Sequence, residues 1–408
     1  MKDAENPMNS LFPHGLAIPG KTKIVLLVLD GLGGLPLEPG GRTELETARK
    51  PNMDALAARS ALGLTQPAGA GVTVGSGPGH LALFGYDPIE NEIGRGALEA
   101  LGVDFDLGPE DIAARGNFCT VDPAGRVTDR RAGRIPTEAG RRLAERLREI
   151  RVEGVEFFIE PVKEHRFAFI IRGPGLSDAL SDSDPLKTGV PPFPVRPLEA
   201  QAERAAASVN RFIGQAGRLL QDEAPANMVM LRGFARLPQL PTYAELYGLR
   251  SAAIAIHGMY RGVARLAGME VLEVHGQTLE AEAAALERCW NDFDFFYMHV
   301  KKTDTCGEDG DFAGKVRAIE EVDALLPRLL ALKPDVFLIG GDHSSPAALG
   351  RHSWHPVPLM LHARHVREDG LPEFGERACA RGSLGTLPAT QVIRLALAHA
   401  ERLAKYGA

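Results

Sequence analysis

Three apolar segments of this 408-residue chain are each followed by an aspartate, and this pattern constrains the fold more than any other feature. The segments are Lys23–Leu29 before Asp30, Phe293–Val300 before Asp304, and Val336–Gly341 before Asp342. Such runs of apolar and β-branched residues are typical of strands buried on both faces of a parallel sheet. Because ligands bind at the carboxyl ends of strands in these sheets, we expect the three aspartates to meet at one site.

The first of these strands is separated from the other two by more than half of the chain, and the residue composition and the predicted elements change in between. From about residue 93 to residue 236 arginine becomes frequent and short strands alternate with helix patterns. We therefore predict an α/β core of residues 21–92 and 240–408, with a mainly parallel sheet flanked by helices. Residues 93–239 are predicted to form a smaller inserted α+β domain.

Individual elements are predicted from periodicity and from Pro and Gly positions. The predicted helices span residues 51–59, 81–84, 141–150, 258–266, 280–290, 315–330 (kinked near Pro327) and 389–406. Further predicted strands span residues 166–171 and 270–274, and the Pro-rich stretch 186–197 is predicted to be a loop. Residues 1–20 are expected to form a loose arm.

The composition is that of a soluble globular protein, and the formal net charge of -7 disfavours a nucleic-acid or acidic-membrane partner. The four cysteines are scattered without metal-knuckle spacing, which is consistent with reduced thiols. No apolar signal core or membrane-length apolar stretch occurs, so we expect a cytoplasmic protein. The sequence carries no signal for the oligomeric state.

The aspartates have histidines close by, which points to a metal site. Carboxylate oxygen and imidazole nitrogen together suit Mn²⁺ or Zn²⁺ better than Ca²⁺. The candidate ligands are Asp30, Asp304, Asp342, His343 and His352. A single aspartate after a strand is more often a helix cap than a ligand. Three of them, together with the Gly340-Gly341-Asp342-His343 run, favour the metal site.

Ser76 is the candidate nucleophile, because it lies between two glycines in a turn that could expose its hydroxyl. The segment lacks the G-x-S-x-G spacing of a hydrolase elbow, so activation of the hydroxyl by metal is the better account. A plain flexible turn is the alternative for Ser76. His80 is a candidate for the same site, although a histidine at a helix start is more often structural.

Arg130, Arg131 and Arg134 form a third candidate element. Guanidinium groups clamp phosphate or carboxylate through two parallel hydrogen bonds, so this cluster suits a small anionic ligand. The alternative is a solvated charged surface, which is the usual meaning of a charge run. Arg232 and Arg261 could add further positive charge.

Taken together, these residues resemble the cofactor-independent phosphoglycerate mutases of the archaeal type, in the alkaline phosphatase superfamily. The resemblance runs from about Lys23 to Tyr406. It is carried by Val28-Leu29-Asp30-Gly31, Gly85-Tyr86-Asp87-Pro88, Gly94 to Ala100, Arg115-Gly116-Asn117-Phe118, Asp129 to Arg134, Gly310-Asp311-Phe312, Gly341 to Ser344, and His352 to Pro358. It implies an alkaline-phosphatase-like sheet with an inserted domain that closes over the site.

The resemblance also implies two divalent metal ions, usually Mn²⁺ (with Zn²⁺, Co²⁺ or Mg²⁺ as alternatives), and no need for 2,3-bisphosphoglycerate. One ion would be held by Asp30, Ser76, Asp342 and His343, and the other by Asp304, His352 and Glu308. Ser76 would carry the phosphoryl group between the 3- and 2-hydroxyls of glycerate, in glycolysis and gluconeogenesis. Asp129 would shuttle protons, and Asn117, Arg130, Arg131, Arg134 and Arg261 would bind the small phosphorylated three-carbon acid.

Four positions depart from the family pattern. Glu308 stands where the family motif Asp-x-x-Gly-His has a metal-binding histidine, and it adds negative charge to the site. Gly77 follows the nucleophile where relatives often have an acid, and Arg261 stands near Tyr260 where the family has lysine. His355 stands where relatives often have Asp or Asn, and it is a candidate replacement ligand.

Three functions are compatible with these residues. The leading hypothesis is a metal-dependent phosphoglycerate mutase that uses a phosphoserine. The second is a related phosphotransferase or phosphatase of the same superfamily, including a homoserine-kinase-like enzyme. The third is a non-catalytic binding protein that has lost a working metal pair, for which Glu308 is the only sequence support.

Overall fold

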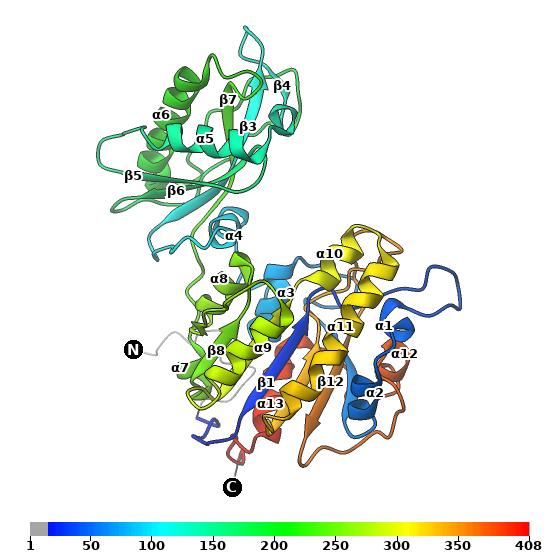
Figure 1. Cartoon of the computed structure of the whole chain (residues 1–408). Helices are drawn as coiled ribbons and strands as arrows, with labels where there is room; N and C mark the ends of the chain where they lie inside the picture. Colours follow the sequence, from blue (N-terminus) through cyan, green and yellow to red (C-terminus); the bar gives the residue numbers. More distant parts are fainter. Residues whose placement is uncertain (1–14, 408) are drawn as a thin grey trace. The chain divides into compact units, whose positions relative to one another are not determined.

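The computed structural model describes residues 15–407, which divide into two compact units. One unit combines the chain up to Glu92 with the chain from Leu240 onward, and the other comprises Ile93–Gln239. Both units are mixed α/β structures (Figure 1). Among the described residues, no helix has the length and apolar character needed to cross a membrane.

The first unit is built on a mainly parallel eight-stranded sheet with the strand order β13-β2-β12-β11-β1-β10-β8-β9. The strands are β1 (Ile24–Leu29), β2 (Ala61–Gln66), β8 (Ser251–Ile254), β9 (Glu270–Val271), β10 (Phe295–Val300), β11 (Val336–Gly340), β12 (Val357–Ala363) and β13 (Gly385–Pro388). β1 lies between β10 and β11 and is parallel to both, whereas β12 is antiparallel to its two neighbours. The predicted fold class is thus confirmed, and the three strands recognised in the sequence are adjacent at the centre of the sheet.

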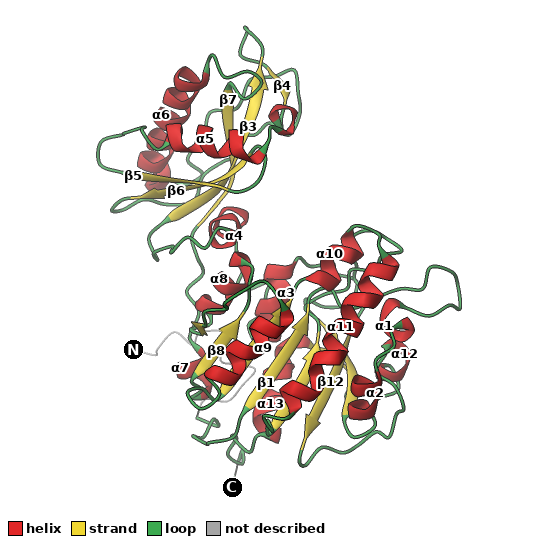
Figure 2. Cartoon of the chain, viewed as in Figure 1, coloured by secondary structure: helices red, strands yellow, loops and turns green. Residues whose placement is uncertain are grey.

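The central strands are buried on both faces, as their continuous apolar sequences predict. Every residue of β1, β10 and β11 is buried. Helices cover both faces of the sheet (Figure 2). The helices of this unit are α1 (Glu44–Thr47), α2 (Pro51–Ala57), α3 (Ser76–Leu83), α7 (Tyr243–Tyr247), α8 (Gly258–Leu266), α9 (Leu279–Arg288), α10 (Lys302–Glu308), α11 (Phe312–Leu330), α12 (Glu376–Cys379), the 3₁₀ helix η4 (Ala389–Gln391) and α13 (Val392–His399).

The second unit has its own sheet, with the order β4-β3-β6-β5 and with β7 paired to β3. Its elements are α4 (Arg95–Gly102), β3 (Ile112–Val121), β4 (Val127–Asp129), η2 (Ala132–Arg134), α5 (Thr137–Leu147), β5 (Glu156–Pro161), β6 (Arg166–Arg172), η3 (Ala200–Ala202), α6 (Glu203–Leu220) and β7 (Met228–Ala235). Alternate residues of β6 face two separate cores. Phe167 and Phe169 pack with α5 and α6, and Ala168 and Ile170 pack on the α4 side, as period-two alternation requires.

Several predicted boundaries were wrong. α3 begins at Ser76, five residues earlier than predicted, so the glycine-rich segment becomes helical at the serine itself. α5 spans Thr137–Leu147 instead of 141–150, and α13 ends at His399 instead of 406. β9 has only two residues, and α11 is assigned as one helix through Pro327, which lies in its last turn.

The predicted loose arm lies partly outside the described residues. Within residues 15–20, however, the backbone pairs with the C-terminal segment. Ile18 N donates to Arg402 O at 2.9 Å, and Ala404 N donates to Leu16 O at 2.7 Å. For this described part the expectation of a loose arm is wrong, because the segment is hydrogen-bonded.

Candidate metal centre and basic cavity

The five acidic and imidazole side chains expected to bind metal lie together in the first unit. Asp30 follows β1, Asp342 and His343 follow β11, Asp304 lies in the short helix α10 after β10, and His352 lies in the loop before β12. All except His352 are at most 1% exposed. The carboxyl ends of adjacent parallel strands thus place them at one edge of the sheet.

Two groups of side chains there have donor atoms close enough to share an ion. One group is Asp30, Asp342 and His343, and the other is Asp304, His343 and His352. His343 Nε2 lies 3.3 Å from Asp30 Oδ1 and 3.2 Å from Asp342 Oδ2. Both of these oxygens are buried, and their close contacts are imidazole nitrogens: His343 for Asp30, and His343 and His80 for Asp342. Buried anionic oxygens require nearby positive charge, and the mixed oxygen and nitrogen set suits a divalent metal.

Ser76 is the first residue of α3 and points at this cluster. Its Oγ lies 3.0 Å from Nε2 of His343. His80, one turn later, contacts the same region, because its Nδ1 lies 2.8 Å from Ser76 O and 3.1 Å from Asp342 Oδ2. A Cβ at Gly79 would collide with Asp342 O, so a glycine there lets the helix approach the Asp342 backbone.

Cationic and imidazole groups next to Asp30 and Asp304 stabilise their ionised forms. Burial alone would raise the pKa of Asp30, but hydrogen bonds from His299 and His343 hold this pKa well below its ordinary value. His299 Nε2 lies 2.9 Å from Asp30 Oδ2. The Lys301 ammonium donates to Asp304 Oδ2 at 2.6 Å and lies 3.5 Å from Asp30 Oδ2. The site therefore favours positive charge between the carboxylates.

His352 is bound to the same cluster from the other side. Its ring stacks on His343 with 3.8 Å between the centroids. Its Nε2 lies 3.4 Å from Asp304 Oδ1 and 3.3 Å from Glu308 Oε1. Burial would lower the pKa of His352, but the hydrogen bond to Asp304 outweighs burial and raises it to about 9.

Glu308 and His355 contribute less directly than the other candidates. Glu308 has a side chain that is 53% exposed, and it belongs to neither of the two donor groups. His355 belongs to neither group as well, and its Nδ1 lies 3.0 Å from Ser353 Oγ. The Glu308 carboxylate thus contacts the second donor group only at His352, whereas the His355 ring contacts Ser353 in its own loop.

A buried lysine ties together the two loops that carry Asp30 and Asp342. Lys315 Nζ, fully buried in α11, donates to Gly31 O at 2.8 Å, Gly33 O at 3.0 Å and Ser345 O at 2.8 Å. Gly31 has a φ of 61°, and a Cβ there would lie 2.7 Å from both Asp304 Oδ1 and Ser345 Oγ. Only glycine fits this turn without displacing groups of the cluster.

The second unit contains a strongly basic cavity of about 550 Å³. It is lined by Arg115, Asn117, Arg130, Arg131, Arg134, Lys163, Glu164, His165, Arg166 and Arg232. Burial and the charges of Arg95 and Arg115 lower the pKa of Arg232, which shows how closely like charges are packed. The Oδ1 atom of Asn117 is buried without a hydrogen-bond partner among the described residues. The cavity can therefore hold an anion that also donates a hydrogen bond.

The three arginines of the predicted cluster differ in their surroundings. Arg130 makes a two-point ion pair with the buried Asp184, at 3.0 and 2.7 Å. Arg131 and Arg134 line the cavity, Arg131 directly before η2 and Arg134 as its last residue. Asp129 accepts hydrogen bonds from the N–H groups of Arg131 and Gly133, at 2.8 and 2.7 Å, and these bonds lower its pKa. Asp129 thus orders the turn, and the two hydrogen bonds favour its ionised form.

Comparison with known proteins identifies relatives along the whole chain. A family model described as 2,3-bisphosphoglycerate-independent phosphoglycerate mutase matches residues 57–227. A probable 2,3-bisphosphoglycerate-independent phosphoglycerate mutase of Thermus thermophilus is 53% identical over 404 residues, covering 98% of this chain and 100% of the relative. The chain belongs to the 2,3-bisphosphoglycerate-independent phosphoglycerate mutase family. The Aquifex aeolicus protein of the same printed name is 49% identical over 95% of this chain and 97% of its own length.

Solved structures agree with membership of this mutase family. The cofactor-independent phosphoglycerate mutase from Thermoplasma acidophilum superposes with a TM-score of 0.76 at 30% identity, covering 93% of this chain and all of that one. The PH0037 protein from Pyrococcus horikoshii has a TM-score of 0.79 at 28% identity, covering 95% of this chain and all of that one. The family resemblance stated from the motifs is thus confirmed.

Sequence reasoning missed several residues around these mutase-family motifs. His299 lies in β10 and Lys301 follows it, and both contact Asp30 directly. The strand-end segment His299-Val300-Lys301 was a signal that could have revealed them. Arg115 lines the basic cavity although its motif was used only for the resemblance. Lys315 has no local signal, since its carbonyl partners come from distant loops. Arg261, predicted with the arginine cluster, lies in α8 of the other unit.

Proposed function

We propose that this chain interconverts 3-phosphoglycerate and 2-phosphoglycerate through a phosphoserine formed on Ser76. The observation that carries this proposal is the 3.0 Å approach of Ser76 Oγ to His343 Nε2. This nitrogen lies between the two donor groups, 3.3 Å from Asp30 Oδ1 and 3.9 Å from Asp304 Oδ1. A serine hydroxyl is a weak nucleophile by itself, and it is placed here where cationic charge can activate it.

The reaction consists of two phosphoryl transfers. In the first, Ser76 Oγ loses its proton and attacks phosphorus, the Oγ–P bond forms, and the bond from phosphorus to the glycerate 3-oxygen breaks. The released oxygen takes up a proton. In the second transfer, the glycerate 2-hydroxyl loses its proton and attacks phosphorus, the bond from the 2-oxygen to phosphorus forms, and the Oγ–P bond breaks. Oγ then takes up a proton, which restores the Ser76 hydroxyl. We propose that Asp129 exchanges these protons with the glycerate hydroxyls.

The residues of the cluster would hold two divalent cations, for which Mn²⁺ is the proposed identity. Asp30, Ser76, Asp342 and His343 would form one ligand set, and Asp304, His352 and Glu308 would form the other. Bound cations would neutralise charge on the phosphoryl oxygens and lower the pKa of the serine hydroxyl. The two groups of close donor atoms that share His343 support this assignment.

The basic cavity is proposed to hold the glycerate portion. Arg131 and Arg134, which lie beside the turn ordered by Asp129, would bind the carboxylate, and Asn117 Oδ1 would accept a hydrogen bond from a hydroxyl. Arg130 would act mainly through its ion pair with Asp184, which fixes this wall. Arg261 remains a proposed phosphate contact. We also propose a cytoplasmic location, where glycolytic substrates are found.

The relatives favour the mutase over the related phosphotransferase or phosphatase. The direct test is ³¹P NMR of 3-phosphoglycerate incubated with the full-length protein and Mn²⁺, without 2,3-bisphosphoglycerate. The proposal predicts 2-phosphoglycerate, with no net release of inorganic phosphate. Ser76→Ala should abolish this conversion, whereas Ser208→Ala, a buried serine of α6, should retain it.

A second readout separates the phosphoserine route from direct transfer. Protein quenched during turnover should gain one phosphoryl group by intact mass spectrometry, and peptide mapping should place it on Ser76. Conversion by Ser76→Ala at the wild-type rate, or release of inorganic phosphate as the main product, would exclude the proposed route.

A further inference from the structure

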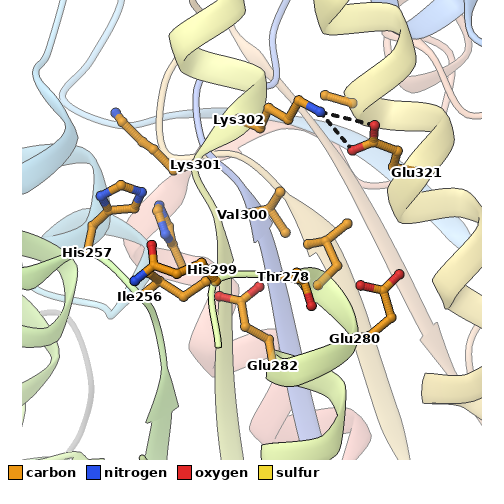
Figure 3. Close-up of a pocket in the computed structure, with 13 residues that line it drawn as sticks. Ile256, His257, Thr278, Glu280, Glu282, His299, Val300, Lys301, Lys302 and Glu321 are labelled. Atoms are coloured by element: carbon orange, nitrogen blue, oxygen red, sulfur yellow. Dashed lines mark hydrogen bonds and ion pairs between the residues drawn. The ribbon is translucent and has the colours of Figure 1, made fainter. Parts of the chain in front are cut away.

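A second cavity of the first unit lies at the carboxyl ends of β8 and β10, next to the metal cluster but lined mostly by other residues. Its volume is about 440 Å³, within the size range of small-molecule sites. His257 follows β8, Lys301 follows β10, and α9 supplies Glu282 (Figure 3). The carboxyl ends of parallel strands are where α/β sheets bind ligands.

Glu282 is the unusual member of this cavity. The residue is only 2% exposed, and burial is the one influence that shifts the pKa of its carboxyl, without a contribution from a hydrogen bond or an opposite charge. Figure 3 shows this carboxyl pointing from α9 toward the space between His299 and Thr278. A buried carboxyl that lacks a partner is costly, so a cavity that keeps one has an acceptor ready for a ligand.

The charged neighbours of Glu282 are already engaged elsewhere. Lys302 donates to both carboxyl oxygens of Glu321, at 3.0 and 3.1 Å, and is turned away from Glu282 (Figure 3). Lys301 donates to Asp304, which lies in the metal cluster. Glu280 adds a second carboxylate to the cavity. With both lysines paired to carboxylates, the acidic groups left in the lining are Glu280 and, once it ionises, Glu282, which favours a cationic occupant.

We propose that this cavity binds a small organic cation, with a primary ammonium that pairs with the Glu282 carboxylate and a short aliphatic part against Ile256, Leu279 and Val300. These apolar residues line the same cavity. An ammonium with three N–H donors would supply the partner that Glu282 lacks, and its pairing is strengthened by the burial of the carboxylate. The site is distinct from the basic cavity of the second unit, which is lined mainly by arginines.

Binding of an ammonium should depend on pH in a defined direction. Burial raises the pKa of Glu282 to about 8, so the carboxyl is mostly protonated at neutral pH and must lose its proton to pair with the ligand. The other titratable groups that line the cavity are His257, Glu280, His299, Lys301, Lys302 and Glu321. Affinity should therefore increase from pH 6.5 to pH 8.5, with release of a proton on binding.

The test uses n-butylammonium as the probe and 1-butanol as its uncharged match, with the full-length protein. Methyl NMR of the wild-type protein should show saturable shifts of Leu279 and Val300 with n-butylammonium at pH 8.5, and an affinity for 1-butanol at least about tenfold lower. Glu282→Gln should weaken n-butylammonium by about tenfold or more. Glu287→Gln, on the same helix but paired with Arg328 outside the cavity, should leave binding unchanged.

Three results would overturn the proposal: no saturable shift of the cavity methyls, equal affinity for n-butylammonium and 1-butanol, or undiminished binding by Glu282→Gln. Circular dichroism of each variant establishes that it is folded before binding is measured. The wild-type comparison of amine and alcohol needs no variant, so the proposal remains testable whatever the stability of the mutants. It is also independent of mutase activity, since the readout is binding.

Discussion

The buried carboxyl of Glu282 should make the stability of this protein depend on pH, and removing its charge should stabilise the fold. Burial raises the pKa of this group from 4.5 to about 8 in the folded state. Between these values the folded protein holds a proton that the unfolded chain has lost. Stability therefore falls as the pH rises from about 4.5 to about 8, and the loss is complete above that range.

The size of the effect follows from the pKa difference. Each pKa unit corresponds to about 1.4 kcal/mol, so Glu282 should cost about 3 kcal/mol at pH 7 and about 4–5 kcal/mol above pH 8. Glu282→Gln keeps the shape of the side chain but cannot ionise. The variant should match the wild-type protein near pH 5 and exceed its free energy of unfolding by several kcal/mol at pH 8.5.

Urea unfolding followed by tryptophan fluorescence measures this difference. Trp290 and Trp354 both belong to the unit that contains Glu282, so the signal reports on the relevant structure. Glu287→Gln, in the same helix but with an exposed side chain paired with Arg328, is the control and should show no comparable pH-dependent gain. A difference between wild type and Glu282→Gln that stays constant from pH 5 to pH 8.5 would refute the reasoning.

Three further predictions concern the metal cluster. Lys315→Met should lower the free energy of unfolding by about 3 kcal/mol, because three carbonyl contacts and a buried charge are lost, and it should also weaken Mn²⁺ binding in calorimetric titrations. The pKa of His352 is raised to about 9, so the metal-free protein should lose stability as the pH rises from about 6.5 to 9, which urea unfolding at several pH values measures. The affinity for Mn²⁺ should increase over the same range, because His352 must lose its proton to bind metal, and calorimetric titration at the same pH values tests this. Glu308→His should increase the affinity for Zn²⁺ by about tenfold, measured in competition with a chelator, because an imidazole nitrogen suits zinc better than a carboxylate oxygen. Unchanged affinity would show that residue 308 does not belong to the second ligand set.

The Glu282 and Lys315 sites show two opposite ways to bury an ionisable group in one unit. Lys315 is surrounded by carbonyl oxygens from both metal-site loops, and its ammonium is fully satisfied. Glu282 has no such partner among the described residues and faces a cavity instead. A buried carboxyl without a partner lowers the free energy of unfolding. Such a cost is expected at a binding site, because groups placed to meet a ligand are often unfavourable for the stability of the ligand-free protein.

Local patterns in the sequence were sufficient for the central sheet and for most of the metal cluster. The apolar runs before Asp30 and Asp342 form strands because burial on both faces demands continuous apolar side chains, and parallel pairing then brings their ends together. Asp304 joins them through a short helix, which the sequence did not reveal. The start of α3 at Ser76 was missed because glycines disfavour a helix locally, while close packing against Asp342 requires them.

By itself, then, the sequence determined the family, the three central strands and the acidic and imidazole residues Asp30, Asp304, Asp342, His343 and His352 that meet at the sheet edge. Only the tertiary structure decided which ionisable side chains are paired with other groups and which face a cavity where a ligand could bind. Arg130 is paired with Asp184, which lies 54 residues away, Lys315 reaches carbonyls some 284 residues distant, and Glu282 is left alone in a cavity. The physical reason is that desolvation and pairing depend on neighbours brought together by folding, and no local window of sequence contains them.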